Sequence, residues 1–259
     1  MSATVATFGQ SVVAAASLFL LVWIASVTKR DASLVDRFWG LSFVTIAWVG
    51  LARGPAPSAV ALASVAAVSA WGLRLSAYLT LRNWGRGEDR RYGAMRERAG
   101  ERFWLLSLVS VFSLQALLSA VISLPVQAAL LDRGQLGALQ IGGLALFAIG
   151  LVVETLADAQ LARFTRDPRS RGAVMDRGLW RWSRHPNYFG EVLVWWGLGL
   201  VGAKGPHGLL ALVGPALITF LLLRVSGVTM LERTIGERRP GYAEYARRTS
   251  AFVPWPRRA

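Results

Sequence analysis

Apolar segments long enough to cross a membrane are the feature that most constrains the fold of this chain. Hydrophobic residue types make up 54% of the sequence, and the mean hydropathy is +0.42. A helix needs about 20 apolar residues to span the hydrocarbon core, where it satisfies its own backbone polar groups. The sequence therefore predicts an all-α, polytopic integral membrane protein, formed as a single domain over residues 1–259. We expect seven transmembrane helices, at residues 5–28, 38–52, 58–81, 103–131, 136–161, 188–201 and 209–231.

The formal net charge of +14 indicates how the chain is oriented in a membrane rather than binding to a nucleic acid. Nearly all of the 29 Lys and Arg residues fall in four segments, 29–37, 82–102, 163–184 and 224–258. These segments alternate with loops that carry few basic residues. The positive-inside rule then places the amino terminus outside and the carboxyl terminus in the cytoplasm. The expected location is a bacterial inner membrane, with contacts to membrane lipid and with the protein as a monomer.

Several classes of chemistry are excluded by what the sequence lacks. It has no cysteine, and His185 and His207 are its two histidines, so a metal site is not expected. GxxxxGK[ST] is not present, and no alternation of strands and helices could carry a nucleotide-binding glycine motif. A GxSxG serine motif is also missing.

Segment 182–191, with the sequence WSRHPNYFGE, is the most informative motif. Pro186 suits the first turn of a helix, which would leave Arg184 and His185 just outside that helix. The free amides and the dipole at a helix start favour an anion. A ligand site at the membrane edge is one interpretation, and a basic loop that only anchors the helix is the other.

Charged residues inside or beside the apolar segments point to a polar cavity. An unpaired charge at the bilayer centre costs about 2.5 to 3.5 kcal/mol on insertion scales, so such residues face a wet cavity or one another. Glu154 and Asp158 are four residues apart and share one helix face. Two loops, 82–92 and 163–172, combine glycine with arginine, whose planar fork suits phosphate. Their alternative is a solvated interfacial belt.

A family resemblance rests on Glu154 and Asp158, on Gly178-Leu179-Trp180, on segment 187–191 and on the tail through residues 252–255. With these motifs the chain resembles the steroid 5-alpha-reductase family, in particular its bacterial membrane relatives. The resemblance implies a seven-helix membrane enzyme that reduces the 4,5 double bond of a 3-oxo-4-ene steroid or a similar apolar enone. NADPH is the implied cofactor, in a cavity open to the cytoplasm. The C-terminal half would mainly hold NADPH, and the N-terminal half would mainly form the substrate cavity.

The implied cofactor contacts are carried over position by position. Asn83 and Arg86 resemble an Asn-x-Gly-Arg contact, and Asn187 and Glu191 resemble an Asn-x-x-x-Glu pair near the nicotinamide. The full set implied for the cofactor is Asn83, Arg86, Glu154, Asp158, Arg166, Arg184, His185, Asn187, Tyr188, Glu191, Arg224, Tyr245 and Arg248.

The resemblance also implies residues that activate the substrate ketone. Hydride addition to the β-carbon of an enone places negative charge on the ketone oxygen, which needs a hydrogen-bond donor. Asp36, kept protonated in an apolar cavity, matches the acid of the family. Aligning Arg74 and Tyr78 with the family leaves Trp71 where the family has a donor tyrosine. Trp71 would then donate through its indole N–H, or Tyr78 would donate, or the substrate would differ. The substrate, a steroid or another lipid-like molecule, would enter from the bilayer.

Two other classes of function remain open. The Arg-His-Pro-x-Tyr string and the paired tyrosines of the tail also resemble membrane methyltransferases of isoprenylcysteine and phospholipid amines, which use S-adenosylmethionine. Asn187, Glu191, Asp158 and the arginines favour the reductase, since S-adenosylmethionine carries no phosphate. A non-catalytic lipid-binding protein would leave the buried carboxylates unexplained.

Overall fold

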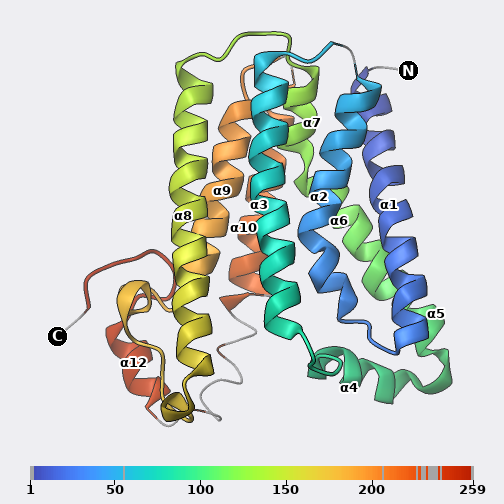
Figure 1. Cartoon of the computed structure of the whole chain (residues 1–259). Coiled ribbons are helices and arrows are strands. Elements are labelled where there is room, and N and C mark those ends of the chain that lie inside the picture. The colour runs from blue at the N-terminus through green and yellow to red at the C-terminus, as the bar shows by residue number, and fades with distance from the viewer. Residues whose placement is uncertain are drawn as a thin grey trace. The chain divides into compact units, whose positions relative to one another are not determined.

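The structure, a computed structural model, describes residues 3–54, 56–205, 207–225, 227–228, 232, 239 and 241–257 (Figure 1). Every named element in these ranges is helical, as the sequence predicts. The chain forms two compact units. Unit 1 comprises Met1–Gln140 and Leu200–Gly214, and unit 2 comprises Ile141–Gly199 and Pro215–Ala259.

The described residues include five helices that are long and apolar enough to cross a membrane. They are α1 (Ala3–Lys29), α2 (Leu34–Arg53), α3 (Ala59–Asn83), the helical run Arg90–Ile122 and α8 (Ala138–Arg166). Their length and composition support the expected integral membrane protein.

The last two predicted spans correspond to shorter apolar helices. Helix α9 (Pro186–Gly202) has 17 residues, and an apolar helical run extends over Leu210–Val225 and includes α10 (Val213–Phe220). Residues 226 and 229–231 of the seventh predicted span lie outside the described residues. Seven crossings and their orientation therefore remain predictions.

The predicted span 103–131 is divided into two helical runs. After α5 (Phe103–Ser107), a π-helical turn and α6 (Leu114–Ile122), helix α7 begins anew at Leu124 and ends at Leu131. Pro125 lies in the first turn of α7, where its missing amide hydrogen is not needed but where it would interrupt a continuous helix. The Gln127 side chain donates to the Ala120 carbonyl at 2.7 Å and so satisfies a backbone group near the break.

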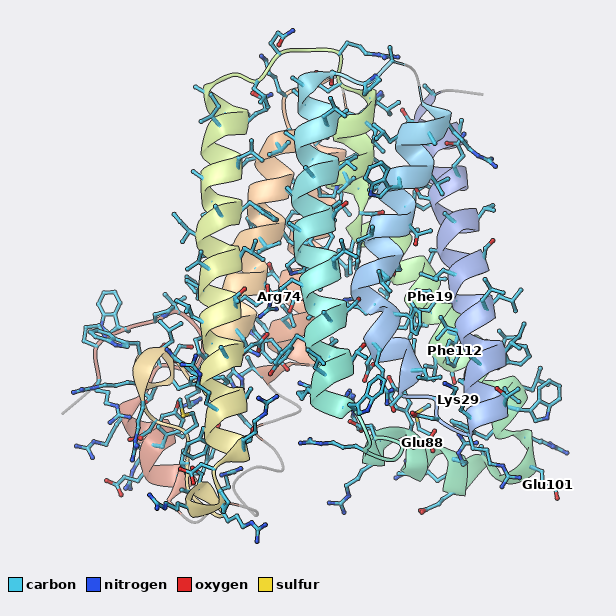
Figure 2. All side chains as sticks on the ribbon, in the orientation of Figure 1. Phe19, Lys29, Arg74, Glu88, Glu101 and Phe112 are labelled. Carbon is cyan, nitrogen blue, oxygen red and sulfur yellow. The ribbon has the colours of Figure 1, made fainter. Side chains whose placement is uncertain are left out.

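Small residues bring α2 and α3 of unit 1 together. A Cβ atom built on Gly40 would lie 2.3 Å from the Gly72 carbonyl oxygen, and one on Gly72 would lie 2.5 Å from that of Gly40. Such close backbone approach is typical of packing between membrane helices. Phe19 and Phe112 are buried in the core between α1 and the π-helical turn (Figure 2). Helix α4 (Arg90–Ala99) lies across the end of α1 and α2 (Figure 1).

Glycines also set the packing of α8 against α9 in unit 2. A Cβ atom on Gly190 would lie 2.6 Å from the Glu154 backbone nitrogen, and one on Gly197 would lie 2.5 Å from that of Phe147. The tail, which includes α12 (Tyr242–Arg248), joins the loop before α9. The Arg184 amide donates to the Ser250 carbonyl at 2.8 Å, and the Trp255 amide donates to the Trp182 carbonyl at 3.0 Å.

Candidate functional site

The predicted site residues fall into two groups, one in each unit. Unit 2 holds Glu154, Asp158, Arg166, Arg184, His185, Asn187, Tyr188, Glu191, Arg224, Tyr245 and Arg248. Unit 1 holds Asp36, Trp71, Arg74, Tyr78, Asn83 and Arg86.

Two buried carboxylates and one amide form the centre of the unit 2 group. Glu154 and Asp158 lie on one face of α8 and are only 3% and 4% exposed. Asn187, in the first turn of α9, donates from Nδ2 to Asp158 Oδ1 at 3.3 Å. The buried Oδ1 of Asn187 has no hydrogen-bond partner among the described residues. A buried acceptor of this kind is costly unless a ligand or water satisfies it.

Neighbouring residues of α9 extend this group. Glu191 is one turn after Asn187 and therefore lies on the same helix face. Tyr188 stacks on the His185 ring, with centroids 5.6 Å apart and planes within 5°. The aromatic ring pair thus covers the start of α9.

The loop before α9 has the predicted layout and an unpredicted acidic partner. Helix α9 begins at Pro186, and Arg184 and His185 precede it. Arg184 Nε and Nη2 donate to the two carboxylate oxygens of Glu232 at 2.7 and 3.0 Å. His185 Nε2 lies 3.1 Å from Glu232 Oε1. Burial alone would raise the pKa of Glu232, but the hydrogen bonds from His185 and Arg184 outweigh it and hold that pKa below its ordinary value.

Further contacts show that this loop is held by the tail. Arg184 Nη1 donates to the carbonyls of Ala246 and Thr249 at 2.6 and 3.2 Å. The Tyr245 hydroxyl donates to the Trp180 carbonyl at 2.6 Å, and burial is the main reason why its pKa is raised. Arg184, His185 and Tyr245 were predicted as cofactor contacts, and the structure places them in contacts with their own chain. Glu232 is 48 residues from Arg184, and no local pattern in the sequence pairs the two.

Exposed arginines gather at the end of α8. Arg166 is the last residue of the helix, and Arg163, Arg169 and Arg171 are exposed near it. None of these four forms an ion pair with a residue that the structure describes. Arg224 is exposed on the π-helical turn Leu221–Val225, and Arg248 pairs with exposed Glu244 at 3.1 Å. The arginines after α8 are therefore the ones available for phosphate groups.

Asp36 anchors the unit 1 group. It lies in the first turn of α2 and accepts hydrogen bonds from Arg91 Nη2 at 2.8 Å and from the Tyr92 hydroxyl at 2.9 Å. Tyr92 is 8% exposed. Both donors belong to α4. The sequence does not indicate Tyr92 as a site residue, because it follows a basic loop rather than an apolar segment. Asp36 is the acceptor in both hydrogen bonds, so within the Tyr92–Asp36 pair the tyrosine hydroxyl is the donor.

Glu88 and Asp89 hold α4 in place. Glu88 accepts from the Ala32 amide at 2.7 Å and from Arg96 at 2.9 and 2.7 Å. Burial would raise the pKa of Glu88, but the hydrogen bonds from Arg96 and Ala32 lower it below its ordinary value. Asp89 caps α4 by accepting from the Arg91 amide at 2.9 Å.

The two predicted alternatives to Tyr92 have different surroundings. Trp71 is fully buried in edge contact with Phe43, with centroids 5.5 Å apart, which is the setting of a packing residue. Tyr78 is partly exposed, and the guanidinium groups of Arg74 and Arg82 lie 5.4 and 5.6 Å from its ring centroid. Asn83 is the last residue of α3, and Arg86 is exposed in the loop that follows.

Residues 22–249 of the chain match the family model described as Protein of unknown function (DUF1295). The chain belongs to the DUF1295 family. This family includes steroid 5-alpha-reductase-like proteins. The chain is also similar to the uncharacterized protein C594.04c of Schizosaccharomyces pombe, with 27% identity over 263 residues that cover 90% of this chain and 76% of the relative. No solved structure shows a significant match.

The matched region of DUF1295 contains both groups of candidate residues, from Asp36 in unit 1 to Arg248 in unit 2. In this DUF1295 protein no three His, Asp or Glu side chains within the described ranges gather closely enough to hold a metal ion. The described candidate residues offer hydrogen bonds, charged groups and a buried amide acceptor.

Proposed function

We propose that this DUF1295 protein is an NADPH-dependent membrane reductase that saturates the carbon–carbon double bond of an apolar enone, such as a 3-oxo-4-ene steroid. One observation carries the proposal: the Asn187–Asp158 hydrogen bond beside Glu154, with the buried Asn187 Oδ1 left as an open acceptor. Membership of a family that includes steroid 5-alpha-reductase-like proteins supports the same reading.

The residues of unit 2 fit the polar parts of a reduced dinucleotide. The open Oδ1 of Asn187 can accept a hydrogen bond from a carboxamide N–H. Carboxylates such as Asp158 and Glu154 can accept hydrogen bonds from ribose hydroxyls. Arg166 and the exposed arginines around it offer planar forks to phosphate oxygens. When bound, the cofactor would supply a hydride to the β-carbon of the enone, and water would supply the proton that the α-carbon takes up.

In the substrate half, Tyr92 is proposed to donate a hydrogen bond to the ketone oxygen. Negative charge grows on that oxygen as the β-carbon accepts the hydride, so a preorganised donor lowers the barrier. The Tyr92 hydroxyl carries one proton, which it donates to Asp36 in the structure, so donation to the ketone requires this O–H to turn from Asp36 to the substrate while Arg91 still balances the charge of Asp36. This assignment replaces Trp71 as the preferred donor, and Tyr78 stays as the second candidate.

The experiment is a titration of NADPH, NADH and S-adenosylmethionine into the purified, detergent-solubilised chain. We expect NADPH to bind, and we expect Asn187→Ala to weaken it by about tenfold, the equivalent of one buried hydrogen bond. Gln135→Ala, which removes an exposed amide in unit 1, is the control and should bind NADPH as the wild type does.

Either of two results would contradict the proposal. One is binding of S-adenosylmethionine without binding of NADPH, which would assign the site to methyl transfer. The other is equal NADPH affinity in Asn187→Ala and the wild type, which would remove Asn187 from the cofactor site.

A further inference from the structure

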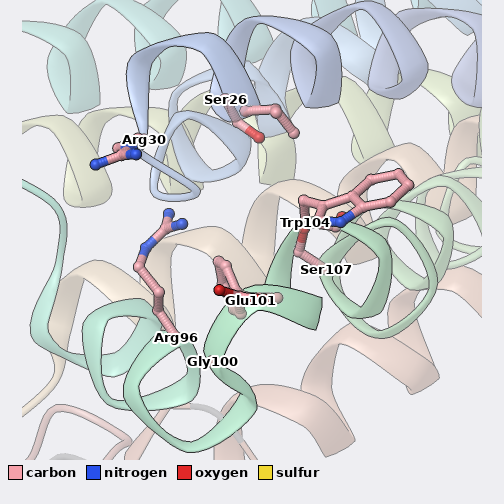
Figure 3. Close-up of a pocket in the computed structure, with 9 residues that line it drawn as sticks. Ser26, Arg30, Arg96, Gly100, Glu101, Trp104 and Ser107 are labelled. Atoms are coloured by element: carbon pink, nitrogen blue, oxygen red, sulfur yellow. The ribbon is translucent and has the colours of Figure 1, made fainter.

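A pocket with charged and apolar residues in its lining lies in unit 1, where α1 ends and α5 begins. It has a volume of about 310 Å³, and its lining includes Ser26, Val27, Arg30, Arg96, Glu101 and Trp104 (Figure 3). Arg30, after α1, and Arg96, on α4, both line this pocket (Figure 3). Two like charges placed in this way favour an anionic group between them.

Arg30 is held in an unusual conformation at this pocket. Its φ of 52° lies in the left-handed region, which a side chain with a Cβ atom adopts at a cost. Its guanidinium forms no ion pair or hydrogen bond with any residue that the structure describes. This conformation ends α1 in a Schellman-type cap, in which the Asp31 amide donates to the Ser26 carbonyl at 3.0 Å, and it sets the position from which the Arg30 side chain enters the pocket lining.

Arg96 faces the pocket as a fixed group. Its Nε and Nη2 atoms donate to Glu88 at 2.9 and 2.7 Å, and its guanidinium lies 4.3 Å from the centroid of the Phe103 ring. These contacts hold the guanidinium plane and leave Nη1 for a further acceptor. A preorganised arginine binds a ligand at a lower entropic cost than a mobile one.

The pocket lies at the depth of lipid headgroups. Lys29 ends the first apolar helix, and Lys29 and Glu101 lie at the same end of unit 1 (Figure 2). Trp104 is 51% exposed, and the Trp23 indole N–H donates to its carbonyl at 2.9 Å. Exposed tryptophans of this kind mark the membrane–water interface. Exposed Ile24 and Leu105 offer an apolar surface nearby for acyl chains.

We propose that this pocket binds the headgroup of an amine-bearing glycerophospholipid, such as phosphatidylethanolamine. The phosphate lies between Arg30 and Arg96, which donate charge-assisted hydrogen bonds to its oxygens. The primary ammonium lies on the Glu101 carboxylate, the acidic group of the lining. The lining therefore matches a zwitterionic headgroup better than phosphatidylglycerol, which would leave Glu101 unpaired.

Native mass spectrometry of the full chain with added dioleoylphosphatidylethanolamine tests this site. The decisive variant is Arg30→Gly, which removes the guanidinium and relieves the left-handed backbone, so its thermal stability should equal or exceed that of the wild type. We expect the variant to bind this lipid about tenfold more weakly, as the loss of a charge-assisted hydrogen bond predicts. Arg98→Gln, which removes an exposed charge from the same helix α4, should bind as the wild type does.

Binding of a second lipid, of the Glu101→Gln variant and of inorganic phosphate tests which headgroup the pocket prefers. Dioleoylphosphatidylglycerol should bind more weakly than dioleoylphosphatidylethanolamine, and Glu101→Gln should reduce that difference. Inorganic phosphate should fail to displace the lipid. Equal binding in Arg30→Gly and the wild type, a preference for phosphatidylglycerol, or displacement by inorganic phosphate would each overturn the proposal.

Discussion

Tyr92 is the residue whose role depends most on its surroundings. Its hydroxyl is directed by Asp36, and Asp36 also accepts from Arg91. The sequence predicts Asp36 as a site residue but does not reveal this partner, because Tyr92 is 56 residues away and belongs to a polar helix. Contacts between distant residues need the packed structure, since the helical period describes only neighbours three or four residues apart.

A prediction about the proposed catalysis follows at this residue. Tyr92→Phe should lower kcat for enone reduction by about 10²- to 10³-fold, the cost of one oxyanion donor. The cofactor affinity should stay unchanged, which titration of NADPH checks. Tyr78→Phe is the matched control and should keep nearly full kcat. A larger loss in Tyr78→Phe than in Tyr92→Phe would assign the donor role to Tyr78.

The carboxylate of Glu232 joins the loop before α9 to the rest of unit 2. Glu232→Gln should reduce the free energy of unfolding by about 2 kcal/mol, because the neutral amide loses the charge-assisted hydrogen bonds from Arg184. Glu244→Gln removes one carboxylate from the exposed pair with Arg248 and should change it by less than about 0.5 kcal/mol. Thermal unfolding of both variants in detergent makes the comparison, and equal losses would show that Glu232 adds nothing beyond a surface charge.

The same carboxylate gives a pH dependence with a defined sign. The pKa of Glu232 in the folded protein lies below its ordinary value of 4.5, so its contribution to stability is complete above that pH. The contribution is lost as the pH falls from 4.5 through the lower, folded pKa. Melting temperatures measured across this range should fall less steeply in Glu232→Gln than in the wild type. Parallel curves would contradict the assignment.

At the scale of helices, the packing of α8 against α9 positions Glu154 and Asp158 beside Asn187. The start of α9 at Pro186 was predicted from the sequence, because proline in a first turn is a local signal. The division of span 103–131 was not predicted, although Pro125 is a local signal of the same kind, because the span was assigned from the high hydropathy of the whole segment, which does not register the break.

Substitution of Gly190 tests the packing of α8 against α9. Gly190→Ala should destabilise the protein by about 1 to 3 kcal/mol, because its Cβ atom would meet the Glu154 backbone nitrogen at 2.6 Å. It should also weaken NADPH binding. Gly142→Ala, on the neighbouring helix α8 with nothing within 4 Å of the added atom, should be neutral or slightly stabilising. The unfolding midpoints of the two variants test this prediction. An unchanged midpoint in Gly190→Ala would show that α8 and α9 can move apart at Gly190.

At the scale of the whole chain, the alternation of basic and apolar segments predicts the topology. Within the part of the chain that the structure describes, five helices are long and apolar enough to cross a membrane, as the apolar segments of the sequence predict. The number of membrane crossings and their direction depend on shorter helices such as α9, whose length alone does not show whether they cross the membrane.

Reporter fusions test the predicted direction. Expressed in a bacterium, a green fluorescent protein fused after the carboxyl terminus should fluoresce, and alkaline phosphatase at the same position should be inactive, because the basic tail is expected to stay in the cytoplasm. An active phosphatase and a dark fluorescent protein would reverse the orientation.

Transfer of an isotope tests the proposed reaction most directly. The purified chain would be incubated with NADPH that carries deuterium at the hydride-donating carbon and with a 3-oxo-4-ene steroid, and the product would be analysed by mass spectrometry. The proposal predicts a saturated ketone with one deuterium at the former β-carbon, and a lower rate of its formation by Asn187→Ala at an NADPH concentration below saturation. No labelled product from any of a panel of apolar enones, although the folded protein binds S-adenosylmethionine, would contradict it.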